Sequence, residues 1–429
     1  MSTIYALNCK HLKKLNLERK YTMNPLLKGV KVLDLSSYIA GPLSTMLMAQ
    51  MGADIVKVEM PVRGDDGRLF MNMSVGHHSA NIITVNHGRK SIEFDIKDSE
   101  GRELLKKLVK EYYVLVEGFR PGLMKRYGLD YETLKAINPR LIYVSVSTYG
   151  QYGPYSSRPG FDLIAQAESG IMDSTGEPDG PPTRVGTYLG DHVGALSILS
   201  SVSASLYNRE KTGEGQHLDI SLYESLAYIS GGIDFYHLLG IKARRTGNHQ
   251  FNSAPYGTFE GRGGRMLAIC APNDVLWEKL CQVMKREDLL SEERFGDMGK
   301  RVTYREEIAD IIQEWLNTFE VADDALDVLR EAGIPAAAVR QDWEMSECPQ
   351  LLARNYFEEV PFPDSVKEIA GRDTYKVRGL PFKTSSDAPN PNYLPLPEVG
   401  EHNFDVYGAV ASEEDISALI DRWHQKFKR

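Results

Sequence analysis

The chain has little cysteine and no long apolar run. Of its 429 residues only 4 are cysteine, and they are scattered without CxxC or histidine spacing, at Cys9, Cys270, Cys281 and Cys348. We therefore predict neither a disulfide framework nor a metal site, and a reducing cytoplasm as the location. No apolar run reaches the roughly 18 residues that a membrane-spanning helix needs, so no membrane partner is expected.

Positive charge is also in deficit, with a formal net charge of -9 at pH 7. This argues against nucleic acid or an anionic membrane as a partner. The 42% hydrophobic and 25% charged residues are typical of a globular protein, and the length favours two domains. Residues 1–23 carry several lysines but lack the apolar core of a secretory signal, so we interpret them as an N-terminal tail.

From Gly29 onward, short β-rich runs alternate with helical periods. Several of the runs are almost continuously apolar, as expected for strands covered on both faces. The pattern predicts an α/β fold with an open, doubly wound, Rossmann-like parallel sheet, whose ligands bind at the carboxyl ends of the strands. The predicted strands are 31–36, 54–60, 90–96, 113–119 and 141–147, and the predicted helices between them are 42–51, 100–110 and 131–136.

Beyond Tyr228 the alternation stops. Residues 252–270 indicate a hairpin with GRGG at its turn, and helices are expected at 274–284, 304–319 and 322–332. A β run at 336–340 and a helix at 412–424, begun by the capping sequence SEED, follow. We predict a large α/β domain at 24–226, a linker at 227–245, a smaller α+β domain at 246–335, and a return segment at 336–429 that completes the large domain.

The stretch from Pro159 to Leu226 holds the candidate reactive group. It predicts a helix at 161–168, a loop rich in glycine and proline, and a long apolar helix opened by Gly190 and Asp191. Unpaired N–H groups at a helix start stabilise an anion or a developing oxyanion. A carboxylate there suits covalent chemistry on an acyl group, but Asp is also a preferred N-cap, so Asp191 as a purely structural cap stays an alternative.

Several motifs resemble one family, the class III CoA-transferases, which include the formyl-CoA, carnitine and bile-acid CoA-transferases of the CaiB/BaiF type. The likeness covers nearly all of residues 24–421 and rests on the order and spacing of LDLSSYIAGP, MGADIVKVEMP, NHGRKSIEFDIK, VEGFRPGLMKRYGLD, PGFDLIAQAESG, the GD pair and KTGEGQHLDISLYES. The resemblance implies that Asp191 is the nucleophile, that acyl-CoA and a small carboxylic acid are the substrates, and that the chain forms an interlocked homodimer.

The same resemblance implies where coenzyme A lies, at the ends of the predicted strands. In that setting arginine and lysine would meet the phosphates, with Arg89 as a further candidate, while Phe94 and Phe119 would contact adenine or the pantetheine arm. Met60 and Gly118 depart from the family pattern. The implied contacts are Ile39, Ala40, Phe94, Asp95, Ile96, Lys97, Gly118, Phe119, Arg120 and Arg126.

Two other functions are compatible with parts of this sequence. The α-methylacyl-CoA racemases resemble much of the same sequence but need the histidine of a GHD motif, where this chain has Gly160, Phe161 and Asp162. His192 adjoins Asp191, and we interpret it as a supporting or structural residue. A non-catalytic CoA-binding protein would tolerate any small residue in place of Asp191.

By resemblance, the reaction would pass through an aspartyl mixed anhydride and an enzyme-CoA thioester. Both are sensitive to water, so the loop 169–190 and the segment 246–250 are candidate lids. The chain lacks the glycine-rich insertion of the oxalate-specific branch, which argues against oxalate and formyl-CoA as substrates. Carnitine, bile acids, succinate and other organic acids stay open. PGFDLIAQ, LGDH and CAPNDVLWEKL resemble members that act on 2-hydroxy acids and their enoyl-CoA products, such as phenyllactate and cinnamoyl-CoA.

Overall fold

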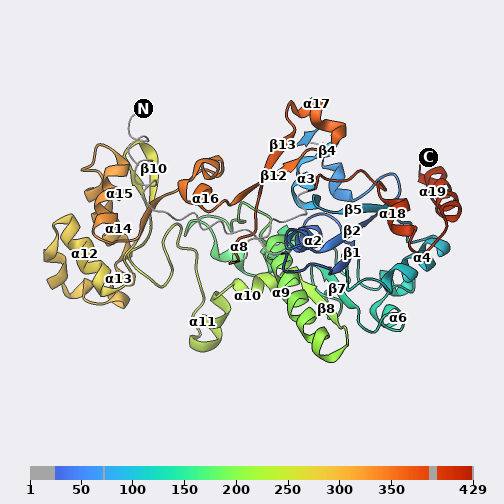
Figure 1. The fold of residues 1–429 in the computed structure, drawn as a ribbon. Coiled ribbons are helices and arrows are strands. Elements are labelled where there is room, and N and C mark those ends of the chain that lie inside the picture. Colours follow the sequence, from blue (N-terminus) through green and yellow to red (C-terminus); the bar gives the residue numbers. More distant parts are fainter. Residues whose placement is uncertain (1–24, 71–72, 386–393, 428–429) are drawn as a thin grey trace. The chain divides into compact units, whose positions relative to one another are not determined.

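The computed structural model describes residues 25–70, 73–385 and 394–427 (Figure 1). The predicted N-terminal tail and Cys9 lie outside these residues. The chain packs as two compact units: the first holds the residues up to 146, 194–220 and those from 355 onward, and the second holds 147–193 and 221–354. The domain boundaries drawn from the sequence differ from this division and stay a prediction about independently folding parts.

A six-stranded sheet forms the centre of the first unit, in the order β5-β2-β1-β6-β7-β8. Adjacent strands from β5 to β7 pair in parallel, which confirms the predicted α/β class with a parallel sheet. The sequence did not predict the edge strand β8. The bounds are β1 Lys31–Leu35, β2 Asp54–Glu59, β5 Lys90–Glu93, β6 Val114–Glu117, β7 Ile142–Ser147 and β8 His217–Ser221.

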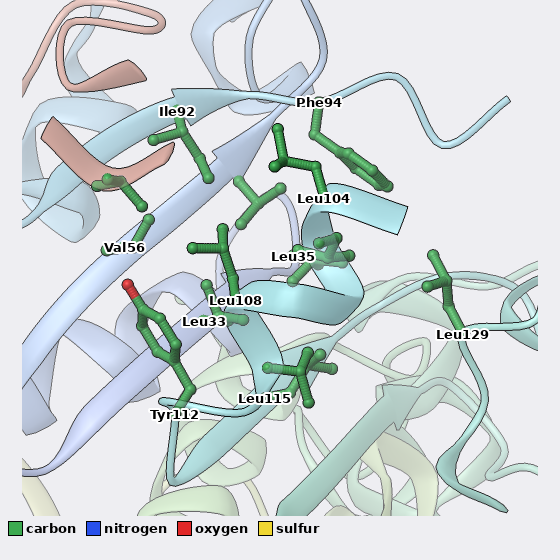
Figure 2. Packing of buried hydrophobic residues seen from close by; sticks show 14 of the residues in the cluster. Leu33, Leu35, Val56, Ile92, Phe94, Leu104, Leu108, Tyr112, Leu115 and Leu129 are labelled. Carbon is green, nitrogen blue, oxygen red and sulfur yellow. The ribbon is translucent and has the colours of Figure 1, made fainter. Parts of the chain in front are cut away.

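Helices bury apolar faces on this sheet, as the helical periodicity predicts. In α4 (Ser99–Val109), Asp98 accepts hydrogen bonds from the N–H groups of Glu100 and Gly101, and so caps the helix. Its buried leucines pack against strand residues in the cluster of Figure 2. The other helices of this unit include α2 Ala40–Gln50, α3 Ala80–Asn86, α5 Leu123–Arg126, α6 Tyr131–Lys135, α17 Lys367–Ala370, α18 Asn403–Tyr407 and α19 Glu413–Phe427.

Two small antiparallel pairs complete the first unit, and neither was predicted. Strands β12 (Phe357–Pro361) and β13 (Thr374–Arg378) pair with each other, as do β3 (Ser74–Val75) and β4 (His78–Ser79). The apolar side chains of β12 and β13 share a core cluster with Ile82 and Ile83 of α3. The segment that returns to the first unit therefore brings its own small sheet.

The second unit contains the predicted hairpin. Strand β9 (Tyr256–Gly261) pairs with β10 (Arg265–Cys270), and Gly263 and Gly264 take φ of 77° and 78° at the turn, which confirms the turn interpretation of GRGG. Strand β11 (Ala336–Ala338) adds to β10. Three helices pack on this sheet around one apolar core, namely α12 Asp274–Met284, α14 Arg305–Leu316 and α15 Ala322–Glu331. The second unit also has the helices α13 Met298–Thr303 and α16 Pro349–Ala353.

The stretch around the candidate nucleophile adds shorter helices to the second unit. Helix α7 is Asp162–Glu168, close to the predicted 161–168, and α8 (Ile171–Ser174) lies in the segment predicted as loop. Helix α9 (Leu189–Thr212) starts in the second unit and continues into the first, and α10 (Leu222–Ile229) and α11 (Gly232–Leu239) follow. Among the described residues, no helix is long and apolar enough to cross a membrane.

Candidate active site

Asp191 lies on the first turn of α9, as its third residue rather than at the position before the helix. The N–H of His192 donates to the carbonyl oxygen of Tyr188 at 3.0 Å, so Tyr188 holds the N-cap position. The alternative that Asp191 is a structural N-cap is therefore wrong. Helix α9 is 24 residues long, and it starts here because the preceding loop, rich in glycine and proline, cannot form a helix.

A second carboxylate does the capping instead. Asp162, buried at the start of α7, accepts a hydrogen bond from the N–H of Gly190 at 2.6 Å. Gln166, one helical turn further on, donates to the other oxygen of Asp162 at 2.7 Å and to the carbonyl of Thr187 at 3.2 Å. The pair thus ties α7 to the start of α9. The sequence offered only the i, i+4 spacing of Asp162 and Gln166 as a signal.

This arrangement sets the electrostatics of Asp191. Its side chain is half-buried, and its carboxylate has no hydrogen-bond partner among the described residues. Burial raises the pKa of Asp191 to about 7, and the negative charge of Asp162 adds to the rise. The result is a carboxylate that is more basic than usual and is not committed to another group.

The neighbouring aromatic and imidazole groups bear on the racemase alternative. Phe161 stands at the N-cap of α7 with 62% of its surface exposed, so the GHD histidine has no counterpart there. The Nδ1 of His192 lies 2.7 Å from the carbonyl oxygen of Tyr188. His192 therefore bonds within its own helix start, in line with a structural role, and in the described part of the chain no imidazole pairs with Asp191.

The predicted coenzyme A contacts lie in the first unit, whereas Asp191 lies in the second. They cluster at the carboxyl ends of three strands: Ile39 and Ala40 after β1, residues 94–97 after β5, and residues 118–120 after β6. A Cβ added to Gly118 would lie 3.6 Å from the Cβ of Ser36, so the loops after β1 and β6 adjoin. The cationic candidates Lys97, Arg120 and Arg126 are exposed there.

Arg89 is a correction, because it is buried and cannot meet a phosphate. Its guanidinium donates to the carboxylate of Asp34 at 2.8 Å and to the carbonyls of Pro42 and Val85 at 2.9 and 3.1 Å. The predicted strand 90–96 and the observed β5 both begin at Lys90, directly after Arg89. Arg89 therefore stands at the amino end of that strand.

Two further candidates offer little side chain to a ligand. The ring of Phe94 is 6% exposed and packs in the core of the first unit (Figure 2), so a ligand would meet its backbone. Asp95 is also buried, and Lys426 of α19 donates to its carboxylate. Phe119 remains partly buried at the edge of the same core.

A buried acid at the end of β6 escaped the sequence interpretation. Glu117 is 3% exposed, and it accepts a hydrogen bond from the N–H of Phe119 at 2.8 Å. Burial raises the pKa of Glu117 to about 7, although that hydrogen bond and one from Ser145 oppose the rise. Glu117 thereby shapes the turn that carries Phe119 and Arg120. It belongs to the motif VEGFRPGLMKRYGLD, but nothing in the sequence pattern shows that it is buried.

The two candidate lids contact each other within the second unit. The N–H of Gly247 donates to the carbonyl of Gly176 at 3.0 Å. Arg245 forms an ion pair with Asp173 at 3.0 Å. Since the loop 169–190 and the segment 246–250 are joined in this way, motion of one would carry the other.

Three possible metal ligands meet in the first unit, although the sequence suggested none. Glu398 lies 3.3 Å from the Nε2 of His77 and 3.1 Å from that of His78. Ser365 donates to the same oxygen of Glu398 at 2.6 Å. These hydrogen bonds account for the cluster, which joins β4 to the C-terminal segment.

Comparison with known proteins identifies the family. The profile of CoA-transferase family III matches residues 27–403. The chain is 37% identical to an acetyl-CoA:oxalate CoA-transferase of Acetobacter aceti, over 80% of this chain and 89% of that protein. It is 36% identical to a succinyl-CoA:mesaconate CoA-transferase of Haloarcula hispanica, over 89% and 95%.

A solved structure agrees. The crystal structure of a CAIB/BAIF family protein from Brucella suis superposes with a TM-score of 0.76 at 32% identity, over 91% of this chain and all of that one. The resemblance seen in the motifs is thereby confirmed, and so is the class of enzyme. The chain belongs to CoA-transferase family III and is a CoA-transferase that moves coenzyme A between acids.

Proposed function

We propose that Asp191 is the nucleophile of this transfer. The observation that carries the proposal is that the two carboxylates have different roles: Asp162 caps α9, and the carboxylate of Asp191, on the first turn, has no hydrogen-bond partner within the part of the chain that the structure describes. A nucleophile must be unprotonated and uncommitted to attack a carbonyl carbon. A pKa of about 7 leaves Asp191 substantially ionised at neutral pH and more basic than an ordinary carboxylate.

The first half-reaction proceeds in two attacks. An oxygen of Asp191 bonds to the thioester carbonyl of the donor, the carbon–sulfur bond breaks, and CoA leaves as a thiolate from an aspartyl mixed anhydride. The thiolate then attacks the aspartyl carbonyl, and the donor acid leaves as a carboxylate. An enzyme-CoA thioester remains on Asp191.

The second half-reaction runs in reverse order with the acceptor. Its carboxylate attacks the aspartyl thioester, expels the CoA thiolate and forms a new mixed anhydride. The thiolate attacks the acceptor carbonyl, which yields the new acyl-CoA and restores the carboxylate of Asp191. Backbone N–H groups and the positive end of α9 favour the negative charge that develops beside Asp191.

The acyl-CoA is assigned to the carboxyl ends of β1, β5 and β6. The order of the sheet reverses between β1 and β6, and ligands of open parallel sheets bind in the crevice at such a reversal. Arg120 and Arg126 supply exposed positive charge for the phosphates. Ile39, Ala40 and Gly118 supply backbone that a ligand can approach closely.

For the acids, we infer a short dicarboxylic acid on at least one side of the exchange. Both curated relatives carry such an acid in their names, oxalate in one and succinyl and mesaconate in the other. The motif likeness to enzymes of 2-hydroxy acids and enoyl-CoA is the second candidate. Acetyl-, succinyl- and cinnamoyl-CoA tested against oxalate, mesaconate, succinate and phenyllactate, with mass spectrometry of the CoA products, separate the two.

The test of the nucleophile uses two substitutions. Asp191→Asn and Asp191→Ala should each lower the rate by at least about a thousandfold, roughly 4 kcal/mol of barrier, because an amide or a methyl group cannot form the anhydride. Hydroxylamine added with an acyl-CoA should convert Asp191 of the parent enzyme to a hydroxamate. An Asp191→Asn enzyme that stays active and resists hydroxylamine would refute the mechanism.

A further inference from the structure

The loop after β1 has an unfavourable backbone conformation at a functional position. Tyr38, between strand β1 and helix α2, has φ of 68°, a left-handed value that L residues other than glycine rarely adopt. The loop lies at the crevice where the sheet order reverses, next to Gly118 at the end of β6. Such conformations persist only where the surroundings hold them, and they concentrate at ligand sites.

Two buried charged residues hold this loop. The carboxylate of Asp65 accepts a hydrogen bond from the N–H of Tyr38 at 3.0 Å, and the ammonium group of Lys57 donates to the carbonyl of Ser36. Lys57 and Asp65 form an ion pair with each other at 2.8 Å. The pair thus binds the loop on both sides of Ser37. Lys57 does so from β2, and Asp65 from the segment that follows β2.

The burial of the pair is almost complete, with side-chain exposures of 2% for Lys57 and 0% for Asp65. A buried ion pair is a weak source of stability, because removing both charges from water offsets their attraction, so its role lies in specific geometry. Lys57 also lies 3.8 Å from the carboxylate of Asp34, but Asp34 has a closer partner in Arg89 at 2.8 Å, and Arg68 pairs with Glu59 at 2.8 Å. Loss of the Lys57–Asp65 pair as a whole would therefore leave the remaining charges balanced.

We propose that Lys57 and Asp65 are positioning residues for the acyl-CoA, which hold Ser36 to Ala40 in the conformation that the ligand needs. The proposal rests on the placement of the acyl-CoA at the β1 and β6 ends. Because the loop is fixed before binding, the ligand does not have to order it, and affinity is higher for that reason. Lys57 and Asp65 have no role in binding the carboxylic acid or in the chemical step at Asp191.

The experiment removes the pair while keeping the charge balance. Lys57→Met combined with Asp65→Ala should raise the KM for acyl-CoA about tenfold, a change of about 1.4 kcal/mol in binding. The kcat and the KM for the carboxylic acid should stay within about twofold of the parent values. Isothermal titration with CoA, on variant and parent, gives the same comparison without turnover.

Arg301→Met is the matched control for lost stability. Arg301 is 1% exposed in the second unit and pairs with Asp274 at 2.6 Å. This variant should melt at a lower temperature than the parent but keep the parent KM for acyl-CoA. If Arg301→Met also raises the KM for acyl-CoA, the rise follows from lost stability in general, and the positioning role of Lys57 and Asp65 is overturned.

The KM for acyl-CoA of the double variant, or of Asp65→Asn, also tests the proposal. A double variant that melts cooperatively and keeps the parent KM for acyl-CoA contradicts the proposal. If the double variant does not fold, Asp65→Asn takes its place: it keeps an oxygen for the N–H of Tyr38 but loses the charge, and should raise the KM roughly threefold. A parent KM there contradicts the proposal too. A parent enzyme that neither binds CoA nor transfers it would instead refute the proposed function.

Discussion

At the scale of single residues, two acids 29 positions apart, Asp162 and Asp191, have different roles at the start of α9. Asp162 satisfies a backbone N–H, which is a structural task, and its charge adds to the effect of burial on Asp191. A helix start with only one acid would make that acid serve as a cap, and its carboxylate would be committed to backbone donors. The second acid therefore allows a free nucleophile at a helix start.

The rate should depend on pH through Asp191. Its pKa is raised from 3.8 to about 7, so the rate should fall as the pH drops through about 7 and the nucleophile becomes protonated. Asp162→Asn removes one cause of the rise and should shift the midpoint of the profile downward. The measurement is kcat/KM between pH 5 and pH 9 for both enzymes.

The raised pKa of Asp191 also makes the free energy of unfolding depend on pH, in the direction opposite to the rate. The folded state binds the proton of Asp191 more tightly than the unfolded state, so this group's contribution to the free energy of unfolding decreases as the pH rises from 3.8 to about 7. Asp191→Asn cannot ionise and should lack this part of the pH dependence. Identical pH profiles of stability for the variant and the parent would contradict the raised pKa.

Arg126 is the most direct test of the first unit's role. It is exposed at the end of α5, and its guanidinium makes no ion pair among the described residues. Arg126→Ala should raise the KM for acyl-CoA with little effect on kcat, because the phosphates lie far from the reacting carbonyl in the ligand itself. The neighbouring exposed Lys125→Ala is the control, and an unchanged KM in Arg126→Ala would remove that residue from the site.

At the scale of elements, the C-terminal helix α19 shows how a local signal and a tertiary contact cooperate. The N–H of Asp415 donates to the hydroxyl of Ser412 at 3.2 Å, which confirms the capping role expected from SEED. Trp423, on the same helix, is fully buried in the core of the first unit. The cap sets where the helix begins, and the tryptophan sets which face is covered.

Removal of the Ser412 cap should lower the free energy of unfolding by a measurable amount. Ser412→Ala should lower the free energy of unfolding by about 1 kcal/mol, because an N–H of the first turn loses its acceptor. Ser412→Asp keeps an acceptor and should stay close to the parent value. Chemical denaturation monitored by circular dichroism distinguishes the two, and equal losses in both variants would refute the capping role.

At the scale of the whole molecule, the resemblance to the family implies an interlocked homodimer, and this stays a prediction. Interlocked chains cannot separate without unfolding, so the dimer should persist on dilution into the nanomolar range. Light scattering coupled to size exclusion, supported by mass photometry at low concentration, measures this. A native monomer would contradict the prediction, whatever the outcome of the kinetic tests.

The sequence by itself determined the features that repeat locally. Apolar runs and helical periods predicted the strands β1, β2, β5, β6 and β7 and those described helices that have ten or more residues, because the spacing of neighbouring apolar residues defines the buried face of a strand or helix. Half of the described α-helices, all of them shorter, were not predicted. Turn glycines predicted the hairpin at GRGG for the same reason. The sequence also predicted the helix start near Asp191, to within two residues of the observed start at Leu189.

Only the tertiary structure decided which side chains meet. Asp162 as the cap of α9, Arg89 as the buried partner of Asp34, and Lys57 with Asp65 under the β1 loop join residues that are 8 to 55 positions apart. No local periodicity encodes these pairs, since the partner of a buried charge is chosen by the packing that excludes water around it. The free state of the Asp191 carboxylate is a consequence of that packing.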